Sequence, residues 1–135
     1  MKKVNEKHLE FIQSAIARMN QNSINIKTCC VTILTAFSGL AKAALIRDAI
    51  LVVSVLLFIF CIMDSYYLYL ERGFRHLYEA ASNLKDDIKL KGDFDMTISE
   101  EDRKPKKFFK ALFSLTEIVF YAGVFIALWI VLVLL

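Results

Sequence analysis

Residues 111–135 read Ala-Leu-Phe-Ser-Leu-Thr-Glu-Ile-Val-Phe-Tyr-Ala-Gly-Val-Phe-Ile-Ala-Leu-Trp-Ile-Val-Leu-Val-Leu-Leu, and this stretch decides the fold class. It contains one charged residue, Glu117, and no charge from Ile118 to Leu135. About 20 apolar residues in a helix span the hydrocarbon core of a bilayer. The sequence therefore predicts a transmembrane helix over residues 108–135. Because the run stays apolar to Leu135, we expect the C-terminus at the far face of the membrane with little beyond it.

The charged residues are separated from the apolar runs. The chain has 135 residues, of which 57% are hydrophobic and 23% are charged, and its formal net charge is +3. Of the 17 basic residues, five precede residue 28, two are Lys42 and Arg47, and ten lie between Arg72 and Lys110. This pattern indicates membrane spans with polar connections. The polar N-terminus, with no short apolar core after it, predicts that no secretory signal peptide is present.

Residues 1–27 are expected to form an amphipathic cytosolic or interfacial segment. Within it, residues 5–19 have the spacing of a helix with one apolar face, formed by Leu9, Ile12, Ile16 and Met19. The polar residues 20–23 predict a break before the next helix. Two placements remain open: this helix lies in the membrane interface, or it packs on cytosolic helices of the same protein.

The first predicted span covers residues 28–45, and the second covers 49–70. Lys27 and Lys42 are expected near opposite faces of the first span, with their long side chains extending outward. The second span is apolar until Asp64, after which a belt of tyrosines precedes two arginines: Tyr66, Tyr67, Tyr69, Arg72 and Arg75. Apolar core, aromatic belt and basic residues in this order indicate a cytoplasmic exit from the membrane.

The second helix is expected to continue to about residue 90, inside a cytosolic extension and linker over residues 71–107. Apolar residues here alternate spacings of four and three, which indicates an interaction stripe along one helix face: Leu70, Phe74, Leu77, Ala81, Leu84 and Ile88. Pro105 suits the first turn of the last helix.

These elements predict an all-α membrane protein with an N-terminal amphipathic helix and three transmembrane helices, the second extended into the cytosol. The N-terminal segment and the second loop carry fifteen of the seventeen basic residues, and the first loop carries two. By the positive-inside rule, the N-terminus is cytosolic and the C-terminus is external.

Two pairs of small residues are spaced for close helix packing in lipid: Thr35 with Gly39, and Gly123 with Ala127. Three short spans bury little surface on their own. We therefore expect homo-oligomers whose helices contact through these pairs.

Asp64 and Glu117 are the acidic residues within apolar segments, and such residues are candidates for function by default. Both are expected roughly 10 Å above the cytosolic face, from their separation from Glu71 and Lys110 at 1.5 Å per residue. At that depth they can meet each other and nearby hydroxyls, namely Ser65, Tyr67, Ser114 or Tyr121. Two interpretations remain open: a polar path or subunit contact formed by Asp64, Glu117 and Tyr121, or carboxylates that only fix helix register.

No motif predicts an enzyme, a cofactor or a metal site. The sequence has no Ser-His-Asp arrangement, HExxH, CxxC or glycine-rich phosphate loop. His8 and His76 are expected to be structural or solvated, and three cysteines to be reduced packing residues: Cys29, Cys30 and Cys61. The basic run 103–110 precedes a span, so we expect anionic lipid headgroups as its partner rather than nucleic acid.

Two sequence boxes resemble a family of small uncharacterised bacterial membrane proteins. The first is His-Leu-Glu-Phe-Ile-Gln-Ser-Ala-Ile-Ala-Arg-Met-Asn-Gln-Asn-Ser at residues 8–23, and the second is Asp-Ser-Tyr-Tyr-Leu-Tyr-Leu-Glu-Arg-Gly-Phe-Arg-His-Leu-Tyr at residues 64–78. The resemblance covers most of the chain and implies the bacterial inner membrane, but no activity for any residue. The alanine-rich, Lys-interrupted end of the first span departs from it. The overall plan is also similar to small transmembrane effectors of anti-phage defence systems.

The sequence thus predicts a non-enzymatic, oligomeric inner-membrane effector of a defence or toxin module. Its oligomer would permeabilise or depolarise the membrane when a cytosolic trigger rearranges the helices. The alternative is a membrane anchor or adaptor that recruits a cytosolic protein partner through the stripe on the helical extension. A proton-coupled transporter using Glu117 is disfavoured because three spans provide no inverted repeat.

Overall fold

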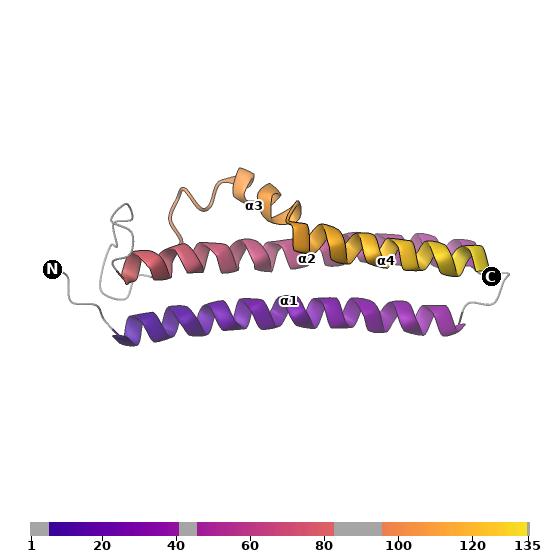
Figure 1. The fold of residues 1–135 in the computed structure, drawn as a ribbon, viewed down its shortest axis with the longest axis horizontal. Helices are drawn as coiled ribbons and strands as arrows, with labels where there is room; N and C mark the ends of the chain where they lie inside the picture. The colour runs from indigo at the N-terminus through magenta and orange to yellow at the C-terminus, as the bar shows by residue number, and fades with distance from the viewer. Residues whose placement is uncertain (1–5, 41–45, 83–95, 135) are drawn as a thin grey trace.

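The computed structural model describes residues 6–40, 46–82 and 96–134, which contain four helices and no strand. Helix α1 (Glu6–Leu40) and helix α2 (Ile46–Ala81) lie side by side and antiparallel (Figure 1). Helix α4 (Leu115–Leu134) runs along the N-terminal half of α2, and helix α3 (Pro105–Leu112) lies at an angle to it. The prediction of an all-α fold is confirmed.

Helix α1 is one helix of 35 residues, so the predicted break at residues 20–23 is wrong. The polar side chains of this region find partners that are compatible with a helix. Gln21 donates a hydrogen bond to Asn25 four residues later, at 3.0 Å. Ser23 donates to Asp64 on α2. Further along, Thr28, Thr32, Thr35 and Ser38 each donate to the carbonyl four residues earlier. The amphipathic segment and residues 28–40 of the first predicted span therefore form one continuous rod; residues 41–45 lie outside the described residues.

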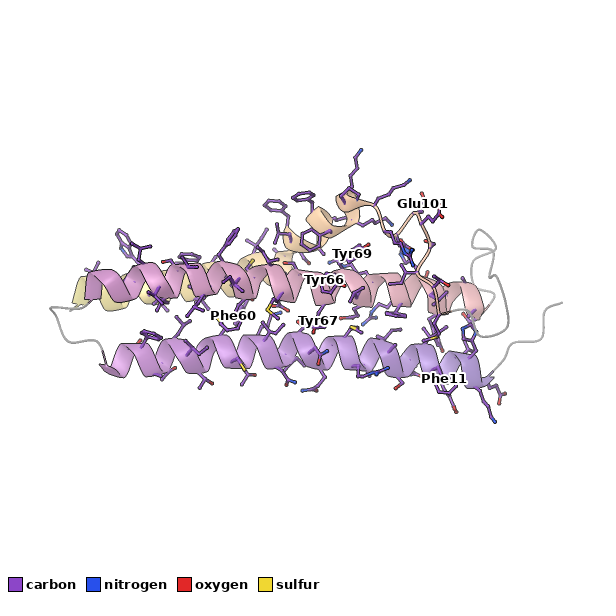
Figure 2. All side chains as sticks on the ribbon, turned by 180° about the vertical axis from the view of Figure 1, so that it is seen from behind. Phe11, Phe60, Tyr66, Tyr67, Tyr69 and Glu101 are labelled. Atoms are coloured by element: carbon purple, nitrogen blue, oxygen red, sulfur yellow. The ribbon has the colours of Figure 1, made fainter. Side chains whose placement is uncertain are left out.

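Helix α2 continues beyond the tyrosine belt to Ala81, which confirms that the helix extends past the belt. The rest of the predicted extension, to about residue 90, falls on residues 83–90, which lie outside the described residues. Its 36 residues measure about 54 Å, well beyond the 30 Å of a hydrocarbon core. Figure 2 shows Phe60 and Tyr67 between α1 and α2, and Tyr66 and Tyr69 on the side of α2 towards α3. The ring of Tyr69 contacts that of Phe108 on α3, with 6.1 Å between the centroids.

Two apolar clusters hold α1 against its neighbours. One contains Cys30, Val53, Leu57 and Tyr121, and joins α1, α2 and α4. The other contains Ile12, Leu77 and Ala81, with Leu9, Ile16, Phe74 and Tyr78 packed around it.

The second cluster corrects the expected role of the interaction stripe. Phe74, Leu77 and Ala81 are covered by α1 of the same chain and do not form an open surface for a partner. The cluster also places the N-terminal part of α1 on α2, which was one of the two placements left open. Leu84 and Ile88 lie outside the described residues.

The last predicted helix is broken: α3 and α4 meet at 47°. Pro105 lies in the first turn of α3, as predicted. At the other end, Phe113 leaves the helical conformation, and Ser114 N donates to Ala111 O at 3.0 Å. Arg72 of α2 donates to the carbonyl of Lys110 at 3.3 Å and to the hydroxyl of Ser114 at 2.9 Å. These two bonds satisfy a carbonyl in the last turn of α3 and hold the break.

Within the described residues, α2 alone is long and apolar enough to cross a membrane. The bent pair α3–α4 counts as a second such segment if the two helices form one broken span. Only 22% of the most apolar window of α2 is buried inside the chain. An apolar helix with this much exposed surface differs from the core helix of a soluble protein, which is mostly covered.

Candidate functional site: a buried charge cluster

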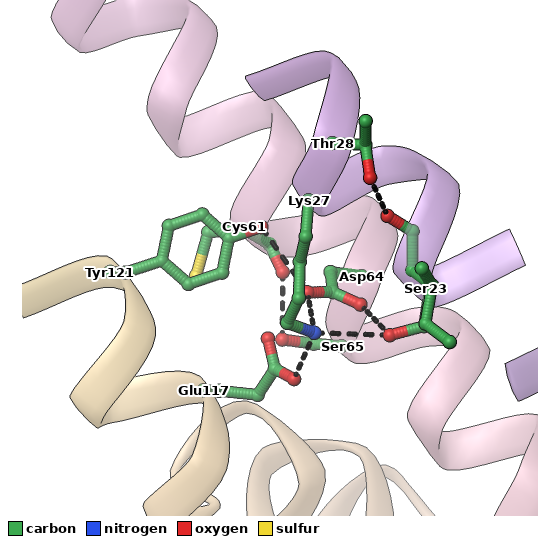
Figure 3. A network of polar contacts seen from close by, with 9 residues as sticks. Ser23, Lys27, Thr28, Cys61, Asp64, Ser65, Glu117 and Tyr121 are labelled. Atoms are coloured by element: carbon green, nitrogen blue, oxygen red, sulfur yellow. Dashed lines mark hydrogen bonds and ion pairs between the residues drawn. The ribbon is translucent and has the colours of Figure 1, made fainter. Parts of the chain in front are cut away.

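Three helices each place one ionisable side chain at the same point of the bundle. Lys27 comes from α1, Asp64 from α2 and Glu117 from α4, and we call these three residues the charge cluster (Figure 3). The cluster lies beside the apolar contacts of Cys30 and Tyr121. It connects helices that are far apart in the sequence.

Lys27 is the centre of the cluster. Its Nζ donates to Asp64 Oδ2, to Glu117 Oε1 at 3.0 Å and to Ser23 Oγ at 3.0 Å. Three donors is the full capacity of an ammonium group. The same nitrogen lies 5.6 Å from the ring centroid of Phe120, within the range of a cation–π interaction.

Asp64 accepts from donors on both of the other helices. It accepts hydrogen bonds from Ser23 and Lys27 on α1, and Tyr121 OH of α4 lies 3.4 Å from Oδ2. Its neighbour Ser65 is also buried, but its hydroxyl donates to the Cys61 carbonyl of its own helix at 2.7 Å. Asp64 is therefore the best-satisfied carboxylate of the cluster.

Local helix periodicity explains how each member reaches the centre. Ser23 and Lys27 are four residues apart on α1, and Glu117 and Tyr121 are four apart on α4. Side chains at this spacing lie on the same helix face. Asp64 follows Leu57 by seven residues on the buried face of α2.

The cluster is shielded from water. The exposed fraction is 0% for Asp64 and 2% for Glu117, and 20% for the side chain of Lys27. Two carboxylates and one ammonium sum to −1 when all three are ionised. Glu117 Oε2 is buried and accepts no hydrogen bond from the described residues. Because a buried charge is costly unless it is paired, this oxygen is the least satisfied atom of the cluster.

Sequence reasoning selected Asp64, Glu117 and Tyr121, and the structure brings these three together. It missed Lys27 and Ser23. Lys27 was expected to extend outward, but it points inward because the two carboxylates offer it better partners than an apolar surface does. Two features of the sequence could have identified them. Ser23 and Lys27 are four residues apart, so they lie on the same helix face, and the acidic residues within the apolar runs, Asp64 and Glu117, have no basic partner in their own runs.

The other residues singled out from the sequence lie elsewhere. Ser114 binds Arg72, and the ring of Tyr67 packs against Tyr66 with 6.0 Å between centroids. Gly123 and Ala127 are exposed on α4, and a Cβ added at Gly123 would meet nothing within 4 Å. Thr35 is exposed on α1, and Gly39 lies near the end of the same helix. One member of each pair, Thr35 of α1 and Ala127 of α4, lines the same cavity between these two helices.

A second polar cluster lies near α3, around Asp102. This carboxylate binds His76 Nδ1 at 2.9 Å, Ser99 Oγ at 2.8 Å and Lys107 Nζ at 3.1 Å. Burial raises the pKa of Asp102, but the hydrogen bonds from Ser99 and Lys107 and the nearby His76 outweigh it and hold that pKa below its usual value. His76, which had no partner in the sequence pattern, thus joins α2 to the segment before α3.

The described side chains of these clusters supply charges and hydrogen-bonding groups. Among the described residues, no group of His, Cys, Asp and Glu is arranged to hold a metal ion. Ser99 donates to Asp102 and not to a histidine, so it is not set up as a nucleophile. The cysteines Cys29, Cys30 and Cys61 are free thiols.

The chain matches no protein-family model, no curated protein and no solved structure.

Proposed function

We propose that the protein is a three-span membrane protein of the bacterial inner membrane, with a cytosolic N-terminus and an external C-terminus. The spans are residues 28–45, the N-terminal half of α2, and α4. The 20 residues of α4 measure about 30 Å, which equals the thickness of a hydrocarbon core. Many large apolar side chains of α2 and α4 are exposed on the single chain, which supports the proposal that these helices contact lipid or other subunits. These side chains are Leu51, Val52, Val55, Phe58, Ile59, Ile62, Met63, Ile118, Val119, Phe125, Ile126, Trp129, Ile130 and Val133.

In this arrangement the charge cluster lies at the inner edge of the membrane. Glu117 is the third residue of α4, roughly 3 Å along the helix from Leu115. This is shallower than the depth of roughly 10 Å expected from a continuous last helix, because α3 bends away before α4 begins. At this depth, a conformational change in the cytosolic part of the protein can reach the charge cluster.

The function that this geometry supports best is a non-enzymatic, oligomeric effector that depolarises the membrane. The single observation that carries it is that Lys27 of α1 holds Asp64 of α2 and Glu117 of α4 together. Withdrawal of Lys27 leaves two carboxylates facing each other across the interface of α2 and α4. Like charges in a low-dielectric site repel, and the acidic lining that results favours cations.

In this account α1 is the control element, because its N-terminal part lies outside the membrane and its C-terminal part carries Lys27. A trigger that moves α1 along α2 separates Lys27 from the carboxylates. Ionisable groups inside membrane segments are costly to keep, which favours a functional role for this cluster.

A membrane anchor or adaptor is the second candidate. It is favoured by the length of the α1–α2 hairpin, which exceeds the hydrocarbon core by about 22 Å. Because α1 covers Phe74, Leu77 and Ala81 of the stripe, a partner would have to bind another face of the hairpin.

Membrane potential in living cells distinguishes the two candidates. A potential-sensitive dye is read in cells that express parent, Lys27→Gln, or Lys27→Gln/Asp64→Asn/Glu117→Gln at matched membrane-inserted levels. The effector predicts stronger depolarisation by Lys27→Gln than by the parent, and none by the triple variant, which keeps polar side chains without charge. Equal potentials in all three strains would contradict the effector and favour the anchor.

A further inference from the structure

A cavity of about 370 Å³ lined by several charged residues lies between α2, α3 and the segment that precedes α3. Its walls carry four permanent cations against two carboxylates: Arg72, Arg75, Lys107 and Lys110 against Glu79 and Asp102. The cavity therefore has an excess of positive charge. It is separate from the charge cluster, whose residues do not line it.

Two of these cations already have acidic partners. Arg75 binds Glu71 at 2.7 Å, and Lys107 binds Asp102 at 3.1 Å. Arg72 binds only neutral oxygens, the carbonyl of Lys110 and the hydroxyl of Ser114. Among the described residues, neither Arg72 nor Lys110 forms an ion pair. Beside these two pairs the cavity wall keeps Arg72 and Lys110 against one carboxylate, Glu79, so the remaining charge is positive.

The geometry around Arg72 suits an anion. Its two bonds across the break between α3 and α4 fix the guanidinium group beside the cavity. A fixed guanidinium offers a planar fork of donors that matches phosphate oxygens. The cavity volume lies at the small end of the range for small-molecule sites, which suits a headgroup-sized ligand.

The surroundings place this cavity at the level of lipid headgroups in the proposed membrane arrangement. Tyr69 lines the cavity and stacks edge-on against Phe108. Phe109 and Phe113 are exposed on the adjoining helix break. Aromatic rings of this kind are typical of the membrane–water interface.

We propose that the cavity binds one phosphate-bearing anion through Arg72 and Lys110. The phosphate comes from the headgroup of an anionic inner-leaflet lipid or from a soluble phosphate ester of the cytosol. Binding here does not require that the charge cluster conducts ions, so the two proposals can fail independently.

The test uses the full-length protein in a neutral detergent at fixed ionic strength. Titration calorimetry with glycerol 3-phosphate probes the soluble source. Native mass spectrometry with added phosphatidylglycerol, against phosphatidylcholine, probes the lipid source. We expect the parent to bind at least one anionic probe; binding of neither would overturn the proposal.

Three variants remove one positive charge each. Arg72→Gln and Lys110→Gln should weaken binding about tenfold or more, as expected for loss of one charge-assisted hydrogen bond. Lys106→Gln is the matched control, because Lys106 is exposed on the same helix and does not line the cavity. It should change affinity by less than about twofold, since a distant exposed charge is screened.

Lys110→Gln is the decisive variant, because Arg72 also holds the break between α3 and α4. Equal loss in Lys110→Gln and Lys106→Gln would show general attraction to a basic helix and overturn the site. No loss in Lys110→Gln would overturn it as well. If Lys110→Gln loses binding of only one of the two probes, phosphatidylglycerol or glycerol 3-phosphate, that probe identifies the source of the phosphate.

Discussion

Lys27 Nζ lies 3.0 Å from Glu117 Oε1, although the two residues are 90 positions apart in the chain. The bond joins the first helix of the bundle to the last, and Asp64 of α2 shares the same nitrogen. A single cation therefore links three helices at one point of the bundle. Its removal should affect the protein more than removal of either carboxylate.

The three single substitutions that remove one charge from the charge cluster should lower the free energy of unfolding by different amounts. Lys27→Gln leaves two buried carboxylates and should cost roughly 3 kcal/mol or more, the scale of breaking a buried ion pair. Asp64→Asn should cost less, because Lys27 keeps Glu117. Glu117→Gln should cost least, because the better-satisfied pair of Lys27 and Asp64 remains. Unfolding by SDS in mixed micelles measures this order. A smaller effect of Lys27→Gln than of Glu117→Gln would contradict it.

The proposed topology rests on the distribution of basic residues along the sequence. Reporter fusions after Leu135 should behave as periplasmic, and fusions before Glu6 as cytosolic. Alkaline phosphatase fusions report a periplasmic location, and fluorescent-protein fusions report a cytosolic one. A cytosolic signal after Leu135 would mean an even number of spans and would remove the three-span arrangement.

The seam between α1 and α2 should be structural. Leu77→Asp places a charge in the apolar cluster around Ile12 and should cost at least about 3 kcal/mol. Ala17→Asp is the control, because Ala17 is exposed on α1. The amount of folded protein after detergent extraction is the readout. Equal yields of the two variants would show that the seam contributes little.

Gly73 allows the segment before α3 to approach α2. A Cβ at this position would lie 2.9 Å from Ile98 Cγ2. Alanine stabilises a helix by about 1 kcal/mol over glycine. Gly73→Ala should therefore stabilise the Ile98→Ala variant by about that amount and the parent by clearly less. A double-mutant cycle of unfolding free energies measures the difference, and equal effects in both backgrounds would exclude the close contact.

Asp102 should make stability depend on pH in the acid range. Its pKa is lower in the folded state, so its contribution is complete above the ordinary pKa of an aspartate, about 4, and is lost as the pH falls through the folded value. Three groups face it: Ser99, Lys107 and His76. The difference in Tm between parent and Asp102→Asn should shrink as the pH falls below about 5. A difference that persists unchanged in acid would show that Asp102 is not charged in the fold.

The helices could be predicted where the sequence pattern that indicates a helix lies within the helix itself. The apolar run after Ile118 and the periodicity from Leu70 to Ala81 are local patterns, and α4 and α2 follow from them. The break at Phe113 could not be predicted in this way. It depends on Arg72, 38 residues earlier than Lys110, whose carbonyl it binds. The continuity of α1 likewise depends on Asp64, which accepts from Ser23 in the polar stretch.

The charge cluster was predictable in part. Asp64 and Glu117 are visible because each interrupts an apolar run. Lys27 is not, because it lies at the edge of its run, where outward extension is the usual behaviour. Its inward direction depends on how α1 is rotated against α2 and α4, and packing of Cys30, Leu57 and Tyr121 determines that rotation.

The coupling between Lys27 and Glu117 tests the central claim most directly. Unfolding free energies of parent, Lys27→Gln, Glu117→Gln and the double variant form a closed cycle. If Lys27 holds the two carboxylates together, the double variant should be more stable than the sum of the single losses predicts, by roughly 1–3 kcal/mol. Additive losses, within about 0.5 kcal/mol, would show that Lys27 and Glu117 act independently and would contradict the account.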